Sequence, residues 1–328
     1  MGDVNKSRRK VLKGIIGGAA LATVPFGNFK IPIFDVTLDE FFQKHYKEMT
    51  PEEKKTVIKR LEEKYDREYG RNDIEIMTTD AIPGVLFGYA LNIQKCIGCR
   101  RCVYACVKEN NQSRHDPNDP SRLQIQWIRV LEFDKFKYKS GGESSDFRSQ
   151  FGNLQAGVDI EQSENYYNSP NVPQSGHFYM PVQCQQCERP PCVKVCPTKA
   201  TWREPDGIVV IDYSWCIGCR FCLAACPYWA RRFNWGIPYL PGKDLNPVMH
   251  YLGNRPRMRG VAEKCTFCIQ RTRKGKYPAC VEICPVGARK FGNLLDPESE
   301  VRKVLAEKRV FRLKEELGTD PKFFYFME

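Results

Sequence analysis

The clearest periodicity of apolar positions lies between residues 50 and 70, in an otherwise charged segment. Val57, Leu61 and Tyr65 recur at every fourth position, a spacing that predicts a helix with one narrow buried face. The segment also carries residues typical of helix ends, namely Thr50, Pro51 and Glu53 at the start and Gly70 at the finish. We expect this helix to pack on the protein's own core, with partner docking as the alternative.

Three segments have the apolar patterns of β-strands. Residues 123–133 alternate apolar and polar side chains before an apolar run, and residues 176–182 form a second candidate. Between them, residues 139–175 are rich in Ser, Gly, Asn and Gln, which predicts a long surface loop or a disordered insertion. The third strand, residues 208–211, follows the turn pair Asp206-Gly207.

The C-terminal part combines one more helical pattern with an aromatic end. Asp296-Pro297 is typical of a helix start, and Val301, Val304 and Leu305 fall on one face of the predicted helix. We therefore expect a helix from residue 296, followed by an aromatic tail at residues 323–326.

The sixteen cysteines fall into four groups of four, and none is left over. Two groups have the bacterial ferredoxin spacing C-x2-C-x2-C-x3-C, and the other two lengthen the middle gap. A proline follows the closing cysteine in three groups and fixes the turn there, whereas Val107 follows in the first. The groups are Cys96, Cys99, Cys102 and Cys106; Cys184, Cys187, Cys192 and Cys196; Cys216, Cys219, Cys222 and Cys226; and Cys265, Cys268, Cys280 and Cys284.

These spacings predict cubane iron–sulfur clusters, each of which needs four thiolates. One tight loop can supply three of them, and in two-cluster ferredoxins the fourth comes from a paired motif. Four motifs therefore predict two ferredoxin units and four 4Fe-4S clusters. Gly98 and Gly218, inside the loops, suit close backbone approach and N–H donation toward sulfur.

Zinc, disulfides and buried structural thiols are the alternative uses of so many cysteines. Zinc ribbons need two C-x2-C pairs and have no use for runs that close with C-x3-C-P. A chain of 328 residues with 42% hydrophobic residues can build its own core without a disulfide framework. Four regular groups also argue against thiols that serve packing alone, and no C-x-x-C precedes a histidine, as haem attachment requires.

The N-terminus has the pattern of a twin-arginine export signal. Arg8 and Arg9 precede a small-residue apolar stretch, residues 14–24, which is shorter than the roughly 20 residues that span a bilayer. This route exports folded proteins, so we expect cluster assembly in the cytoplasm and a final place at the periplasmic face of the cytoplasmic membrane. Cleavage after Ala22 and an uncleaved tether both stay open.

The net charge of +12 does not indicate a nucleic-acid partner once the expected clusters are counted. Residues 1–22 carry five cations and one anion, and four clusters with their thiolates contribute about −2 each. The loaded protein without its signal is therefore close to neutral. A basic loop remains, either as solvated surface or as a docking patch for an acidic partner; it contains Arg271, Arg273, Lys274 and Lys276.

Several motif sequences carry a resemblance to a known family. They are Cys184-Gln-Gln-Cys187-Glu-Arg-Pro-Pro-Cys192, Cys216-Ile-Gly-Cys219-Arg-Phe-Cys222 and Ala225-Cys226-Pro227-Tyr228. They resemble the four-cluster iron–sulfur subunits of membrane-bound oxidoreductases, including molybdopterin enzymes of the dimethyl-sulfoxide-reductase type. The export signal, the segment 263–268 and the ending 316–321 more closely resemble exported subunits of Nrf-type, Dsr-type and Hmc-type redox complexes. The likeness spans about residues 91–326 and leaves out residues 31–80 and the polar insertion.

This resemblance implies an α+β fold of two nested bacterial-ferredoxin-like units that carry four 4Fe-4S clusters, with a helical N-terminal extension and a β/loop insertion. The expected divisions are 1–30 (signal and tether), 31–90 (helical extension), 91–295 (double ferredoxin-like core with insertion 110–178) and 296–328 (C-terminal helix and tail). The implied ligand sets are Cys96, Cys99 and Cys102 with Cys284; Cys265, Cys268 and Cys280 with Cys106; Cys184, Cys187 and Cys192 with Cys226; and Cys216, Cys219 and Cys222 with Cys196.

The motifs and the resemblance together predict a non-catalytic electron-transfer subunit. It would relay single electrons between a polytopic, quinone-interacting membrane subunit or cytochrome and a periplasmic partner such as a multi-haem cytochrome or molybdoenzyme subunit. Its attachment to the membrane would be through these partners or an uncleaved signal. No substrate site is expected, because the sequence has no nucleotide loop, nucleophile triad or molybdopterin motif and its four histidines are scattered. A free soluble periplasmic polyferredoxin carrier is the alternative.

Overall fold

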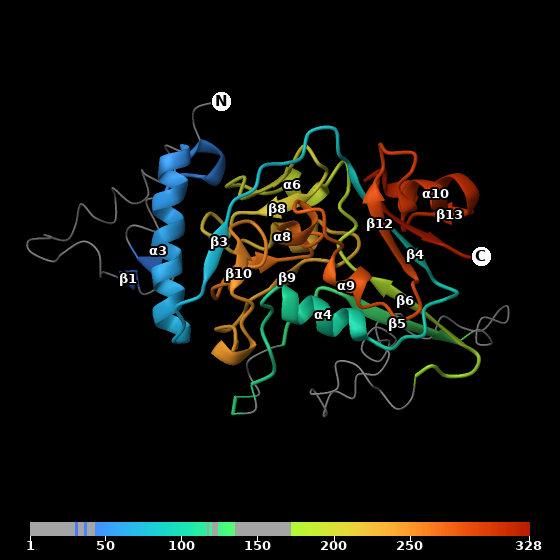
Figure 1. Ribbon diagram of the computed structural model, residues 1–328, viewed down its shortest axis with the longest axis horizontal. Helices are drawn as coiled ribbons and strands as arrows, with labels where there is room; N and C mark the ends of the chain where they lie inside the picture. The colour runs from blue at the N-terminus through green and yellow to red at the C-terminus, as the bar shows by residue number, and fades with distance from the viewer. Residues whose placement is uncertain (1–29, 32–35, 38–42, 117, 120–123, 135–171) are drawn as a thin grey trace, which may run out of the picture.

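The computed structural model describes residues 30–31, 36–37, 43–116, 118–119, 124–134 and 172–328 (Figure 1). The expected export signal, the apolar stretch after it and most of the polar insertion lie outside these residues. None of the described helices is long and apolar enough to span a bilayer.

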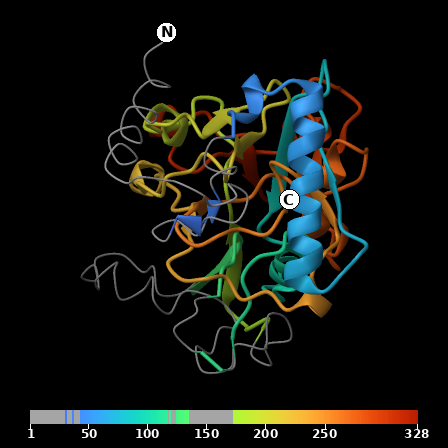
Figure 2. The same ribbon diagram turned by 90° about the vertical axis from the view of Figure 1, so that its left-hand side faces the viewer.

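Helix α3 (Pro51–Tyr69) has the ends and the buried face that the sequence predicts. The Thr50 hydroxyl accepts from the Glu53 backbone N–H, and the Glu53 carboxylate accepts from the Thr50 N–H. Gly70 then ends the helix in the left-handed conformation. The apolar stripe is buried against the rest of the protein, which confirms packing on the core. Figure 2 shows the helix lying along one side of the molecule.

The chain on either side of α3 is also tied to the core. Before it, the 3-10 helix η2 (Tyr46–Glu48) stacks Tyr46 on Tyr251, with ring centroids 5.0 Å apart. After it, β3 (Glu75–Met77) pairs in parallel with β10 (Val248–His250). The described part of the N-terminal extension is therefore packed as part of the folded body.

A four-stranded sheet lies on the side of the molecule opposite α3 (Figure 1). Strand β4 (Phe87–Asn92) pairs antiparallel with β12 (Arg289–Asn293) and parallel with β14 (Phe323–Phe326), and β13 (Val310–Phe311) pairs antiparallel with β14. The aromatic tail is thus an inner strand. Its sequence is apolar at every position and gives no alternation, because both of its faces meet other parts of the protein.

Two predicted strands are confirmed at nearly the expected limits. They are β6 (His177–Val182) and β8 (Val209–Ile211). β8 forms an antiparallel hairpin with β7 (Thr201–Arg203), and Gly207 in the turn has a φ of +84°, which favours glycine.

The strand expected over residues 123–133 is only partly present. β5 (Arg129–Asp134) pairs with β6, but the residues before it do not join the ladder. The Ile125 N–H donates to the Ser113 carbonyl, and the Trp127 N–H donates to the Gln112 side-chain oxygen. These bonds, which no local pattern encodes, take the place of strand pairing.

The C-terminal helix begins later than predicted. α10 runs over Glu300–Glu307 and is capped by Ser299, whose hydroxyl accepts from the Arg302 N–H. The prediction of a start at Asp296-Pro297 was therefore wrong. Asp296 instead holds a turn in which its carboxylate accepts from the Glu298 N–H at 2.9 Å, a role that Asp fills as readily as a helix cap.

The cysteine motifs share one local structure: the third cysteine of each is the second residue of a short helix. These helices are α4 (Arg101–Glu109), α6 (Pro191–Lys194), α7 (Phe221–Ala224) and α9 (Ala279–Glu282). α4 packs on α9, and α6 packs on α7. The remaining described elements are β1 (Lys30–Ile31), β2 (Val36–Thr37), β9 (Arg232–Phe233), η3 (Gly242–Asp244), β11 (Ala262–Glu263), α8 (Ile269–Thr272) and η4 (Glu315–Leu317).

Candidate functional site

The loops that carry the first two cysteines of a motif turn through glycine. Gly98 has a φ of +70° and Gly218 of +71°, a conformation that favours glycine. A Cβ on Gly218 would lie 2.3 Å from the Gly260 carbonyl oxygen. The N–H of each glycine also bonds to the thiol two residues before it, Cys96 or Cys216. These contacts confirm both roles expected of the glycines.

Site 1 combines the first three cysteines of the first motif with the last cysteine of the fourth. All four line a hollow with an empty volume of about 350 Å³, next to Leu91 and Pro181. Burial raises the pKa of the Cys96 thiol to about 12. The members of site 1 are Cys96, Cys99, Cys102 and Cys284.

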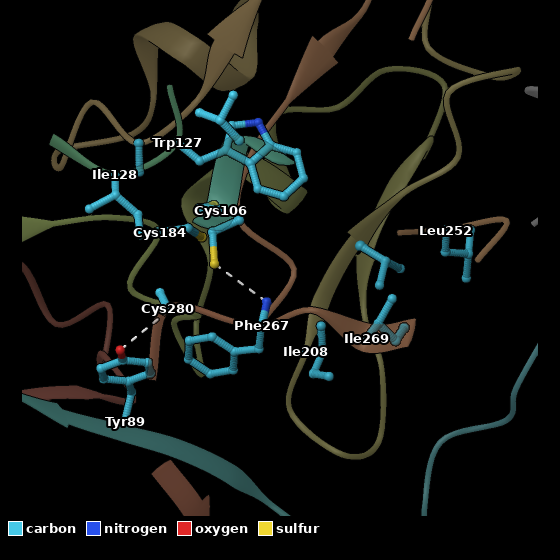
Figure 3. Close-up of a cluster of buried hydrophobic side chains, with 14 of the residues drawn as sticks. Tyr89, Cys106, Trp127, Ile128, Cys184, Ile208, Leu252, Phe267, Ile269 and Cys280 are labelled. Carbon is cyan, nitrogen blue, oxygen red and sulfur yellow. Dashed lines mark hydrogen bonds between the residues drawn. The ribbon is translucent and has the colours of Figure 1, made fainter. Parts of the chain in front are cut away.

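Site 2 combines the closing cysteine of the first motif with the other three of the fourth. Asn110 places its amide nitrogen 3.6 Å from the sulfurs of both Cys106 and Cys268. Burial raises the pKa of the Cys106 thiol well above its usual range, and the three other thiols add to the rise. Figure 3 shows Cys106 and Cys280 in the surrounding apolar core. The members of site 2 are Cys106, Cys265, Cys268 and Cys280.

Sites 3 and 4 repeat this exchange between the second and third motifs. Each surrounds a hollow of nearly the same size as that of site 1, about 340 Å³ and 360 Å³. In both, three thiols come from one motif and the fourth is the closing cysteine of the other. Site 3 consists of Cys184, Cys187, Cys192 and Cys226, and site 4 of Cys196, Cys216, Cys219 and Cys222.

The four sites lie in series. In three pairs of thiols from different sites, burial raises the pKa of one thiol and the neighbouring thiol of the next site adds to that rise, in Cys280, Cys265 and Cys222. The pairs join site 1 to site 2, site 2 to site 3 and site 3 to site 4; they are Cys102 with Cys280, Cys184 with Cys265, and Cys192 with Cys222. All thiols of the two inner sites are buried, whereas three of the four in each outer site are partly exposed.

Two buried arginines donate to cysteine sulfurs, and we did not predict either of them. Arg289 Nη2 lies 3.1 Å from Cys102 Sγ in site 1, and Arg231 Nη2 lies 3.1 Å from Cys192 Sγ in site 3. The sequence does contain a signal for them. Each arginine follows a closing cysteine by five positions in the repeated sequence C-P-x-x-A-R.

Site 2 receives its side-chain hydrogen bonds from neutral groups. Gln112 Nε2 lies 3.1 Å from Cys106 Sγ. The Tyr89 hydroxyl lies 3.4 Å from Cys280 Sγ, as the dashed line in Figure 3 marks. Asn110 and Gln112 belong to the segment expected as an insertion, yet both are fully buried beside this site.

A lysine occupies the space between the two inner sites. Lys264 is fully buried, and its ammonium donates to the carbonyls of Val209 and Cys265. Burial lowers the pKa of this ammonium, while the thiol of Cys184 opposes the change.

The donor sets fit 4Fe-4S clusters. All donors are thiols, and those of sites 1, 3 and 4 surround hollows of similar size, which suits one kind of occupant. The described residues contain no group of three or more His, Cys, Asp or Glu side chains that could hold a single metal ion. Zinc needs sulfurs that converge to about 2.3 Å from one ion, whereas a cubane cluster spreads its four thiolates over the corners of a larger body.

The basic loop is partly engaged within the protein. Arg273 is buried, and Lys274 and Lys276 are exposed. Of the four basic residues in this loop, Lys274 and Lys276 are therefore the ones available to solvent or to an acidic partner. The internal ion pairs join Arg273 to Asp206 and Glu204, and Arg271 to Glu109 and Glu282.

Comparison with known proteins assigns a family to this geometry. The 4Fe-4S dicluster domain matches the sequence twice, over residues 95–200 and over residues 176–239 with 253–294. The protein belongs to the family of iron–sulfur electron-transfer subunits with 4Fe-4S dicluster domains, and its two dicluster domains and sixteen cysteines fit four 4Fe-4S clusters.

Individual relatives are similar over most of their length. The Hdr-like menaquinol oxidoreductase iron-sulfur subunit 1 of Archaeoglobus fulgidus is 38% identical over 72% of this protein and 81% of its own length. One component of the polysulfide reductase of Wolinella succinogenes is 35% identical over 70% of this protein and 87% of its own length.

A third relative corrects the expected limits of the resemblance. One component of the selenate reductase of Mesobacillus selenatarsenatis is 32% identical over 98% of this protein and 97% of its own length. The N-terminal extension and the polar insertion thus fall within a span that a relative shares.

Proposed function

We propose that the protein relays single electrons through four 4Fe-4S clusters in the order of sites 1, 2, 3 and 4, with the sixteen cysteines as iron ligands. The first and fourth motifs would hold the clusters of sites 1 and 2, and the second and third motifs those of sites 3 and 4. This is a nested arrangement of two ferredoxin-like units. The packing of α4 on α9 and of α6 on α7 supports it.

The observation that carries the proposal is the serial order of the sites, with buried sites inside and partly exposed sites at both ends. A cluster supplies one-electron exchange with little rearrangement, and the protein positions the clusters in sequence and keeps water from the inner two. Exposed apolar side chains flank the end sites. They are Ile283 beside Cys284, and Val195 and Ile217 beside Cys196 and Cys216.

Each of the two partly exposed end sites would face a different partner protein. One would be a polytopic membrane subunit that exchanges electrons with quinone or a cytochrome. The other would be a periplasmic molybdoenzyme subunit or multi-haem cytochrome. The names of the relatives support this class, since they are components of a menaquinol oxidoreductase, a polysulfide reductase and a selenate reductase.

We infer export by the twin-arginine route from residues 7–13. Replacing Arg8 and Arg9 together by Lys should leave the protein in the cytoplasm with its iron content unchanged. Cell fractionation of the variant and the wild type measures this. Equal export of both would overturn the assignment.

The relay is tested by anaerobic purification from membranes, with iron, sulfide and co-purifying proteins identified. We expect about sixteen irons per molecule and a membrane subunit. A fully loaded soluble monomer would favour the free polyferredoxin carrier instead. Zinc in place of iron would contradict both.

A further inference from the structure

Four of the buried arginines among the described residues fall into two kinds, and a fifth, Arg100, donates from Nη2 to the Gln126 side-chain oxygen at 2.8 Å. Arg255 pairs with Asp212 and Arg257 with Glu263, at 3.7 Å and 2.9 Å. Among the described residues, Arg289 and Arg231 have no carboxylate partner, although they are only 3% and 5% exposed. A buried charge without a counter-charge is strongly destabilising, so these two positions need negative charge from another source.

The polar partners of Arg289 all belong to the surroundings of sites 1 and 2. Besides the bond to Cys102, its Nη1 lies 2.8 Å from the Tyr89 hydroxyl and 3.3 Å from the Gln183 side-chain oxygen. Tyr89 in turn contacts Cys280 of site 2. The guanidinium therefore sits at the junction of two consecutive sites and touches a sulfur of site 1 directly.

Arg231 has the equivalent place between sites 3 and 4. Its Nη2 bonds to Cys192 of site 3 and, at 2.8 Å, to the Thr201 hydroxyl. The side chain lines the hollows of both sites. The matching C-P-x-x-A-R sequences thus put one permanent cation at the same point of each motif pair, since a guanidinium stays protonated under all ordinary conditions.

We propose that Arg289 and Arg231 tune the relay by raising the reduction potential of the cluster whose sulfur each contacts. Arg289 acts on the cluster of site 1, and Arg231 acts on the cluster of site 3. The inference rests on the proposed function. Reduction adds one electron, taken from a neighbouring reduced cluster, and makes the site more negative by one charge without breaking a bond. A fixed cation hydrogen-bonded to a ligand sulfur stabilises that reduced state. The sulfurs of site 2 have neutral amide and hydroxyl groups as side-chain hydrogen-bond partners, and the charge of Arg289 acts on Cys280 of that site without a hydrogen bond.

Lys264 lies at the third junction, between sites 2 and 3, but its charge depends on the protonation of a buried amine. The proposal is therefore confined to the arginines.

The test compares midpoint potentials of the holoprotein by dithionite titration monitored by EPR, with iron counted in every sample. Arg289→Gln and Arg231→Gln should each lower the potential of one cluster by at least a tenfold change in its reduction equilibrium, about 59 mV for one electron. Arg289→Lys should recover at least half of the loss. Lys290→Gln is the matched control, because it removes a cation from the next residue of the same strand, where Lys290 is partly exposed and 3.6 Å from Glu300. It should change the reduction equilibrium of every cluster less than twofold.

Gln183→Glu is the second variant, in case the glutamine variants lose iron. It leaves Arg289 in place and gives it a carboxylate partner, so the potential of site 1 should fall. Fully loaded variants with unchanged potentials would overturn the role of the arginines and leave the relay intact. A wild type without about sixteen irons would overturn the proposed function itself.

Discussion

At the residue scale, the ligand sets were predictable in part because a cluster needs a fixed number of thiols at close spacing. The spacing identifies the four motifs and predicts that they exchange their closing cysteines in pairs, whereas the choice of which motifs pair came only from the resemblance to a family. The contacts of Arg289 and Arg231 with cysteine sulfurs could not be predicted from the spacing of the cysteines. Arg289 meets Cys102 across most of the sequence, and no local pattern states which sulfur a distant guanidinium reaches.

The exchange of closing cysteines predicts a specific non-additivity. Cys196 lies in site 4 with Cys216, although it belongs to the same motif as Cys187 of site 3. Cys196→Ala with Cys216→Ala should therefore cost one cluster, about four of sixteen irons, as either single change does. Cys196→Ala with Cys187→Ala should cost about eight. Iron analysis measures both; equal losses in the two double variants would contradict the assignment of Cys196 to site 4.

A second residue-scale prediction concerns Gly218. Gly218→Ala places a methyl group 2.3 Å from the Gly260 carbonyl in a backbone conformation that disfavours side chains. We expect a loss of at least 1–3 kcal/mol of stability and reduced iron in site 4. Gly236→Ala is the control, because its Cβ would meet no atom within 4 Å. Thermal unfolding and iron content of the two variants should differ clearly, and similar values would show that the loop adapts to the methyl group.

At the element scale, the sequence predicted helices and strands that depend on interactions between neighbouring residues. It did not predict those that depend on pairing with distant residues. Helix α3 follows its caps and stripe closely because these interactions lie within the helix. Strand β14 is an inner strand only because it pairs with β4, which lies far from it in the sequence. The late start of α10 shows a local ambiguity instead, since Asp296 and Ser299 can each cap a helix and the protein uses Ser299.

The cap of α3 can be tested by itself. Thr50→Ala removes the acceptor for the Glu53 N–H and should cost about 1 kcal/mol, seen as roughly fivefold faster hydrogen exchange in the first turn. Thr56→Ala is the matched control, since Thr56 lies exposed within the same helix and bonds back only to the Glu52 carbonyl. It should leave exchange unchanged or slower. Equal acceleration in both variants would mean that the cap contributes nothing.

At the scale of the whole molecule, the sequence predicted four clusters and did not provide their order. The series depends on how two interleaved motif pairs pack, and this is fixed by contacts such as that of Cys184 with Cys265. The close packing of the N-terminal extension has the same origin. Its seam with the core is the parallel pairing of β3 and β10, which ends at the buried His250.

Protonation of His250, at the end of this pairing, makes the stability of the folded protein depend on pH. Burial, together with the nearby charges of Arg273 and Lys274, lowers the pKa of His250 from 6.5 to about 3. Its Nδ1 accepts from the Leu252 N–H, and its Nε2 meets the Thr79 hydroxyl, which favours the neutral ring. Because the folded pKa is depressed, the unfolded state takes up the proton first, and stability falls as the pH drops below about 6.5.

The expected change between pH 7.5 and pH 5.5 is about 1.4 kcal/mol. His250→Gln cannot be protonated, so its loss over this range should be smaller by that amount. Anaerobic guanidinium unfolding at the two pH values measures the difference. Parallel pH profiles for wild type and variant would mean that His250 is not the titrating group.

The interleaving of the motifs also bears on the order in which the protein is made. Sites 3 and 4 have all their thiols once Cys226 has left the ribosome, whereas site 2 waits for Cys280 and site 1 for Cys284. Cys96, Cys99 and Cys102 are thus the first thiols synthesised and belong to the last site to be completed. During that interval the nascent polypeptide exposes an incomplete ligand set, and whatever delivers iron must either fill sites 3 and 4 first or protect the earliest cysteines until synthesis is nearly finished.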